Sequence, residues 1–299
     1  MRVLRLALPF AMLAVLWQVL DGPQILAKLL NADPLWLSLA MVAALLQFPF
    51  LAFRWRLTAG ALGHPLGRML AIREYFVAQL VNQTLPGGML GDAARIVRTK
   101  GETRLAVAGQ AVLIERLAGQ VTLLLVTLAG LVLAHALPGG VRWPAGTGHA
   151  ALWGLAATGA VLLVVALVAR TRPDTSRRIV APVKRSVFAR RVWPRQLVFS
   201  LGVVTCNLMT FFCAARAIGV ALPAEAVVTL VPLVLTAMLV PLTVAGWGFR
   251  EGAAAALLPL AGIASEPAVA SSILFGAVIL AASLPGVFWL APASEEDED

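Results

Sequence analysis

Three acid–base pairs lie in otherwise apolar sequence, and their side chains are the ones best suited to chemistry. The pairs are Asp92 with Arg95, Glu115 with Arg116, and Arg250 with Glu251. A charged group inside a bilayer is costly, so it either pairs within the protein or marks a pathway for a polar ligand. Arginine suits an anionic ligand because its planar fork donates two parallel hydrogen bonds to a phosphate.

The depth of Glu115 and Arg116 makes this pair informative. It lies about ten residues into an apolar run, which is roughly 15 Å of helix and close to the bilayer centre. Adjacent helical residues point about 100° apart, so each side chain needs a partner elsewhere. We expect a network that joins Asp92 and Glu115 to Arg95, Arg116 or Arg250. Such a network either only ties broken helices together or also binds a lipid phosphate or another anion.

Two breaks rich in glycine interrupt the apolar sequence near these charges. One contains Pro86, Gly87 and Gly88, and the other contains Gly246, Trp247 and Gly248. Membrane proteins break helices mainly where the freed backbone lines a site, and one break in each half is typical of transporters. The polar residues before the first break are Asn82, Gln83 and Thr84. These three could line the same cavity or cap the broken helix, and Trp247 could form a cavity wall.

The composition indicates an integral membrane protein. Hydrophobic residues make up 60% of the chain and charged residues 13%, and the mean hydropathy is +0.87. Six apolar runs approach or exceed the roughly 20 residues that cross a bilayer. They lie near residues 6–20, 35–53, 105–134, 150–169, 197–215 and 269–290. The first run follows Arg2 and Arg5, so a cleaved signal peptide is a minor alternative for it.

The distribution of basic residues predicts the topology. Nineteen of the 24 lysines and arginines fall in patches at residues 2–5, 54–73, 95–104 and 170–195. Placing these patches in the cytoplasm gives six full helices near 5–20, 35–53, 105–134, 150–169, 196–216 and 268–290. Segments 72–94 and 224–263, the latter broken at Pro232 and Pro241, become re-entrant hairpins. The alternative treats their arms as spans and gives about eight transmembrane helices.

The predicted fold is therefore an all-α polytopic membrane protein. Residues 1–290 form one integral-membrane domain, and residues 291–299 form an acidic cytoplasmic tail. Residues 5–134 and 150–290 read as two halves of opposite orientation, which is the order of an inverted repeat. The expected location is the bacterial inner membrane, with both termini in the cytoplasm.

Several classes of function lack the residues that they need. The sequence contains no P-loop, nucleophile elbow or zinc signature, and its cysteines, Cys206 and Cys213, read as small buried apolar residues. We therefore expect no cofactor, no metal and no enzymatic activity. The net charge of +9 is explained by the cytoplasmic patches, so no nucleic-acid partner is expected.

The three motifs in order resemble the lysylphosphatidylglycerol synthase transmembrane-region family. The matching residues are Asn82, Pro86, Gly87, Gly88, Asp92 and Arg95, then Glu115 and Arg116, then Gly246, Trp247, Gly248, Arg250 and Glu251. In bifunctional members this region is the flippase half, and a separate cytosolic domain aminoacylates the lipid. The resemblance spans about residues 5–290. It implies lipid translocation. We expect these thirteen residues to form the substrate site.

The leading hypothesis is a lipid translocase that moves a polar, anionic or aminoacylated phospholipid between leaflets. In it, Arg95, Arg116 and Arg250 contact the phosphate, while Asp92, Glu115 and Glu251 position them or exchange protons. One alternative is a secondary transporter of a small soluble anion. Another is a non-catalytic subunit that regulates a lipid or glycan enzyme through the basic 170–195 loop. The expected partners are accordingly membrane phospholipids and, in the last case, that enzyme.

Overall fold

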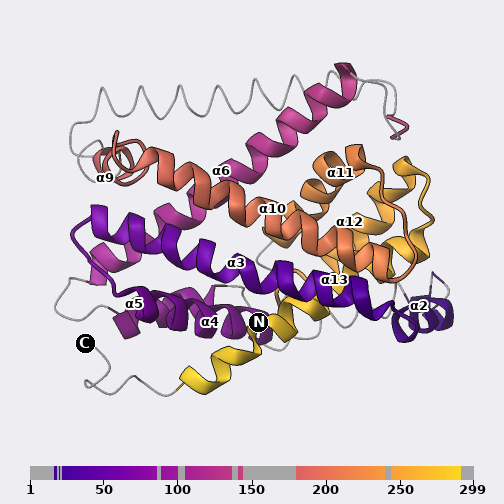
Figure 1. The fold of residues 1–299 in the computed structure, drawn as a ribbon, viewed down its shortest axis with the longest axis horizontal. Helices are drawn as coiled ribbons and strands as arrows, with labels where there is room; N and C mark the ends of the chain where they lie inside the picture. Colours follow the sequence, from indigo (N-terminus) through magenta and orange to yellow (C-terminus); the bar gives the residue numbers. More distant parts are fainter. Residues whose placement is uncertain are drawn as a thin grey trace.

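The computed structural model shows an all-helical protein in which long helices surround two shorter broken hairpins (Figure 1). The structure describes residues 17–18, 20, 22–85, 89–99, 105–136, 141–143, 180–239 and 244–290. No strand occurs in these ranges. The predicted all-α fold is thus confirmed.

Four helices are long and apolar enough to cross a membrane. They are α3 (Pro34–Ala61), α6 (Leu105–Ala136), α10 (Trp193–Ala217) and α13 (Ser265–Ser283), which continues as the 3-10 helix η4 (Leu284–Trp289). They match four of the six predicted spans. The other two, at 5–20 and 150–169, lie outside the described residues apart from the end of the first. The protein is therefore a multi-pass membrane protein.

Local sequence signals set where these helices begin. The Asp33 carboxylate accepts a hydrogen bond of 2.8 Å from the Leu35 amide, and Pro34 occupies the first turn of α3. A proline also lies in the first turn of α10. A short helix, α2 (Gly22–Leu30), precedes α3. A second short helix, α9 (Ala181–Ser186), precedes α10.

Segment 72–94 forms a hairpin of α4 (Arg68–Thr84) and α5 (Leu90–Thr99). The arms are antiparallel, because Gly91 packs against Ala78 whereas the later Arg98 pairs with the earlier Glu74 at 2.8 Å. At 1.5 Å per residue, α5 is about 15 Å long, half of a bilayer core. The arm α5 is thus too short to be a span, and the hairpin returns to the end from which it started.

The second broken segment forms a matching hairpin. Helix α11 (Ala224–Thr236) and the short η2 (Ala237–Leu239) form one arm, and α12 (Phe249–Leu257) with η3 (Leu258–Ala261) forms the other. Its open end is joined through residues 141–143: the Val141 amide donates to Glu225, and the Arg142 amide donates to the Leu260 carbonyl at 2.6 Å. Pro232 lies inside α11, so the predicted break there is wrong. The rival count of eight crossings fails because α12 has only 9 residues.

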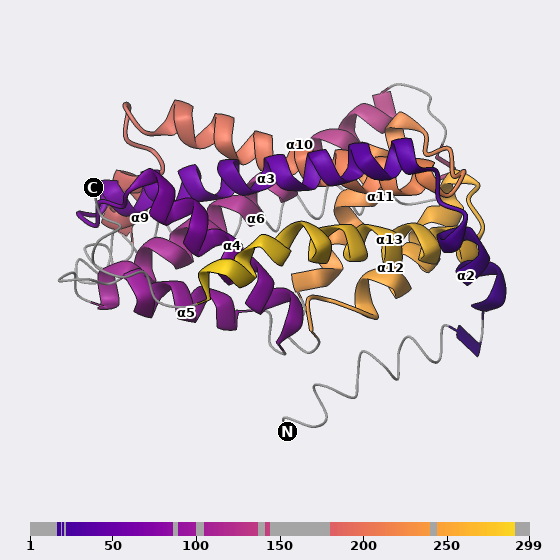
Figure 2. The same cartoon turned by 60° about the horizontal axis from the view of Figure 1, so that its bottom comes forward.

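The two hairpins enter from opposite ends of the molecule, and their tips approach one another in the middle (Figures 1 and 2). Helices α3 and α6 flank the first hairpin in the sequence, and α10 and α13 flank the second. Both halves thus have the order helix, hairpin, helix in opposite directions, as an inverted repeat requires. The side of the membrane that each end faces stays a prediction.

The long helices divide their surface between the protein core and the lipid. Exposed apolar side chains recur at helical spacing, as with Leu35, Leu39, Val42 and Leu46 on α3. The opposite faces bury small residues such as Ala40 and Ala44 in a core shared with α10, α11 and α13. Close packing of the helices explains how charged side chains in the interior are sealed from lipid.

Several predicted features lie outside the described residues. They are Pro86, Gly87 and Gly88, residues 170–179 of the basic 170–195 loop, and the acidic tail 291–299.

Candidate functional site

Glu115 on α6 is the centre of a buried charge network. It is fully buried and binds two arginines from different elements. Arg54 on α3 donates from Nε at 2.9 Å and from Nη2 at 2.5 Å, and Arg95 on α5 donates at 3.0 Å. The Tyr75 hydroxyl on α4 lies 3.2 Å from both carboxylate oxygens. Glu115 therefore joins α3, α4, α5 and α6.

Asp92 extends this network toward the hairpin tip. It accepts from Arg95 at 2.7 Å, three residues along α5, and it also pairs with Arg116 of α6. The Asn82 amide donates to Asp92 at 3.3 Å, and its oxygen accepts from the Gly91 amide at 2.8 Å. Asn82 thus caps the start of α5 from α4, which is the structural role that we considered for it.

Aromatic rings close the other side of Arg95. Its guanidinium carbon lies 4.4 Å from the centre of the Tyr75 ring and 4.7 Å from that of Trp55. Arg95 is only 1% exposed. Two carboxylates and two ring faces therefore compensate this charge, and no face of Arg95 is open to a ligand.

The second half has its own arginine cluster. Arg250 and Glu251 are adjacent and fully buried, and they pair with each other at 2.6 Å. Ser272 of α13 bonds both side chains, and Trp247 and Phe275 present their rings to Arg250. Of the three arginines considered for the network of Asp92 and Glu115, Arg95 and Arg116 therefore join it, whereas Arg250 does not.

The start of α12 explains why these neighbours meet. The Glu251 carboxylate accepts from the Gly248 amide at 2.6 Å, as a residue in the first turn does in a helix cap. Gly246 and Gly248 have φ angles of 76° and 88°, which favour glycine. The cap turns Glu251 back toward the helix start, where Arg250 reaches it.

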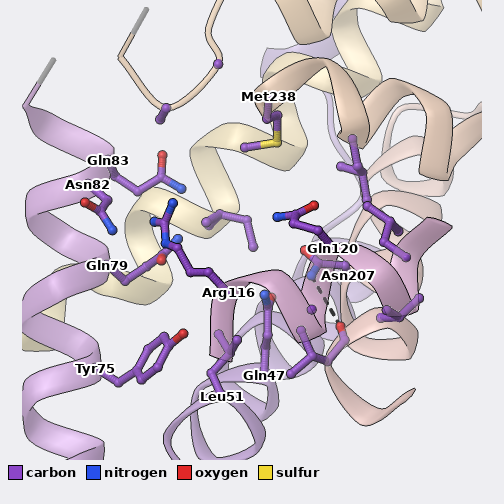
Figure 3. A pocket seen from close by; sticks show the side chains of 18 of the residues that line it. Gln47, Leu51, Tyr75, Gln79, Asn82, Gln83, Arg116, Gln120, Asn207 and Met238 are labelled. Atoms are coloured by element: carbon purple, nitrogen blue, oxygen red, sulfur yellow. Dashed lines mark hydrogen bonds between the residues drawn. The ribbon is translucent and has the colours of Figure 1, made fainter. Parts of the chain in front are cut away.

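A cavity of about 290 Å³ lies between the two hairpin tips (Figure 3). Met89, just after the first break, lines it together with Ala245 and Gly246 of the second break. Arg116 lies among the amides of the cavity, with Gln79, Asn82 and Gln83 beside it and Gln120 and Asn207 on the other side. Helices of both halves thus line one chamber, whose wall combines these polar groups with apolar side chains.

The predicted site residues fall into three groups. Asn82, Arg116 and Gly246 line the cavity. Residues that lie behind its wall, in the two charge clusters, are Asp92, Arg95, Glu115, Trp247, Gly248, Arg250 and Glu251. Pro86, Gly87 and Gly88 are not described. Of the three arginines expected to contact a phosphate, only Arg116 reaches the cavity, and 34% of its side chain is exposed.

Sequence reasoning missed Arg54 and most of the cavity amides. Arg54 was assigned to a cytoplasmic patch, but it lies inside α3 and is 3% exposed. Four cavity amides that we did not predict are Gln47, Gln79, Gln120 and Asn207. All but Gln79 lie in apolar runs long enough to span the membrane, and that signal could have identified them. Gln83, considered for the cavity, lines it, whereas Thr84 instead bonds the Leu80 carbonyl.

The charges around this chamber indicate which ligand it favours. Within the part of the chain that the structure describes, no three His, Cys, Asp or Glu side chains gather as a metal site. Three guanidinium groups face two carboxylates in the first cluster, so its formal charge is one positive unit. A cavity bordered by this excess charge favours an anion.

Comparison with known proteins agrees with the motif resemblance. A search of curated proteins finds none that matches. The model of the family described as the lysylphosphatidylglycerol synthase TM region matches residues 2–286, which is nearly the whole sequence. The chain therefore belongs to the lysylphosphatidylglycerol synthase transmembrane-region family.

Proposed function

We propose that this protein is a non-enzymatic lipid translocase of the bacterial inner membrane, with both termini in the cytoplasm. It moves a polar, anionic or aminoacylated phospholipid between the leaflets. The observation that carries the proposal is the cavity between two hairpin tips that enter from opposite ends, with Arg116 in its wall. Broken helices that meet at a central polar site are the arrangement on which alternating access depends.

The size of the cavity supports transport of a headgroup with its chains left outside. At about 290 Å³ it lies at the small end of ligand pockets. Exposed apolar faces on α3 and α6 offer a path for acyl chains in the surrounding lipid. In this arrangement Arg116 binds the phosphate, and Asp92 and Glu115 hold the arginines in place.

Lipid movement in proteoliposomes tests the proposal. Headgroup-labelled anionic and aminoacylated lipids are incorporated, and the fraction that changes leaflet is measured with time. Arg116→Gln removes one of the two arginines in the cavity wall while Asp92 keeps Arg95 as a partner, so the fold should survive. The rate should fall about tenfold or more, because a hydrogen bond to a charged group is lost. Arg68→Gln, at an exposed position at the start of α4, is the matched control and should behave as wild type.

The small cavity also favours a second candidate, a secondary transporter of a small soluble anion. Uptake of a soluble phosphate ester by the same vesicles, with no lipid movement, would replace the first proposal by this one.

A further inference from the structure

The charged residues that line the cavity are all basic in the part of the chain that the structure describes. Arg54 and Arg116 contribute to its wall. The carboxylates that pair with them, Glu115 and Asp92, lie behind it. A ligand in this chamber therefore meets guanidinium groups and no carboxylate.

Besides Tyr75, neutral amides form the rest of the polar wall. They come from α3, α4, α6 and α10 and are Gln47, Gln79, Asn82, Gln83, Gln120 and Asn207. Two have buried oxygens that no donor reaches within the described residues: Oε1 of Gln47 and Oε1 of Gln83. Arg54 Nη1 is a buried donor that likewise has no acceptor there.

These polar atoms without a hydrogen-bond partner indicate which groups a ligand should carry. A buried amide oxygen without a donor costs free energy, and a ligand hydroxyl that donates to it removes that cost. A buried guanidinium nitrogen needs an acceptor, and an anionic phosphate oxygen is the strongest common one. The wall therefore calls for one ligand that carries both an anionic oxygen and hydroxyl donors.

We propose that the headgroup carried is an anionic phosphodiester bearing free hydroxyls, as in a polyol or sugar phosphate, and that an aminoacylated, cationic headgroup is disfavoured. This inference rests on the proposed function and names the substrate of the same site. An added ammonium group would enter a chamber that already has a positive excess, without a carboxylate to receive it. In surroundings of low dielectric such repulsion is strong.

Lipid competition in proteoliposomes tests this choice. Four lipids share the same acyl chains: phosphatidylglycerol, phosphatidic acid, phosphatidylethanolamine and lysylphosphatidylglycerol. We expect phosphatidylglycerol to move fastest, and phosphatidic acid to move about fivefold more slowly for each hydroxyl bond it lacks. Lysylphosphatidylglycerol should be slowest. Soluble glycerol 3-phosphate, tested for uptake and as a competitor, separates a lipid headgroup from a free phosphate ester.

Two variants test whether the amides cause the preference for phosphatidylglycerol over phosphatidic acid. Gln47→Leu and Gln83→Leu should each slow phosphatidylglycerol about fivefold and leave phosphatidic acid nearly unchanged, so the ratio of the two rates shifts. Gln110→Leu is the matched control, because this glutamine lies on α6 and does not line the cavity. The ratio is insensitive to a uniform loss of folded protein.

The outcomes separate this inference from the proposed function. Movement of lysylphosphatidylglycerol as fast as phosphatidylglycerol overturns the substrate class but leaves a translocase. A ratio unchanged in both amide variants also overturns it. Uptake of glycerol 3-phosphate with no lipid movement overturns the translocase and retains the ligand chemistry. If no lipid moves and glycerol 3-phosphate is not taken up, both the proposed function and this inference are overturned.

Discussion

Replacing Glu115 by glutamine tests whether the buried network holds the first half together. The change is nearly isosteric, but it removes the charge on which Arg54 and Arg95 converge. Arg95 keeps Asp92 and its two aromatic neighbours. Among the described residues, Arg54 has no second carboxylate, and its charge would be left uncompensated at 3% exposure.

The expected loss is large because the arginine remains buried. Removing one partner of a buried ion pair costs about 3–5 kcal/mol. For a chain of this size that corresponds to a fall in melting temperature of roughly 5–10 °C. Thermal unfolding of the purified protein in detergent measures it. The matched control is Glu266→Gln, in the first turn of α13, for which we expect little change.

A second variant separates the charge effect from lost packing. Arg54→Met combined with Glu115→Gln removes both members of the pair, and it should be more stable than the sum of the single losses by about 0.5–3 kcal/mol. If E115Q has the same melting temperature as the Glu266 control, or if the double variant is additive, the buried network does not stabilise the fold.

Three further predictions follow from packing and protonation. Gly276→Ala should disrupt the second cluster, because the added Cβ atom would lie 2.2 Å from Arg250 Nη2. Thermal unfolding should show a lower melting temperature. Gly252→Ala is the control, because its added Cβ atom would meet no atom within 4 Å. Gly91→Ala should open the first hairpin, since its Cβ atom would meet a backbone carbonyl of α4 at 1.9 Å; faster proteolysis of the purified protein should reveal it. Burial lowers the pKa of His64, in the loop after α3, so the unfolded chain binds its proton first and stability should decline as pH falls through about 6.5. Melting temperatures at several pH values check this, and His64→Gln should flatten the curve.

The helices and breaks were predictable because their signals are local. Apolar runs of spanning length identified α3, α6, α10 and α13, and clustered Pro and Gly identified both hairpin turns. The distribution of basic residues then distinguished a hairpin from a span at α4 and α5. It failed at Arg54, because a buried arginine near a helix end has the same sequence context as one in a cytoplasmic loop.

The site was predictable only in part, because its contacts depend on tertiary packing. The acid–base pairs were visible, yet which arginine meets which carboxylate depends on how the helices are placed. Arg250 pairs with its own neighbour because the cap at Gly248 turns Glu251 back. The cavity amides come from four helices, and no spacing along the chain brings them together.

Each half has one buried arginine at its hairpin, and the structural role of these two arginines differs from the ligand-binding role proposed for Arg116. Two carboxylates and two aromatic rings enclose Arg95 in α5, and one carboxylate and two rings enclose Arg250 in α12. Each arginine also bonds the helix that follows its hairpin. An arginine enclosed on all sides fixes its hairpin to that helix. Arg116 instead reaches the chamber where the halves meet. The proposed translocation would use this division, because a group that binds the ligand must be exposed to the cavity while the groups that hold the hairpins stay buried.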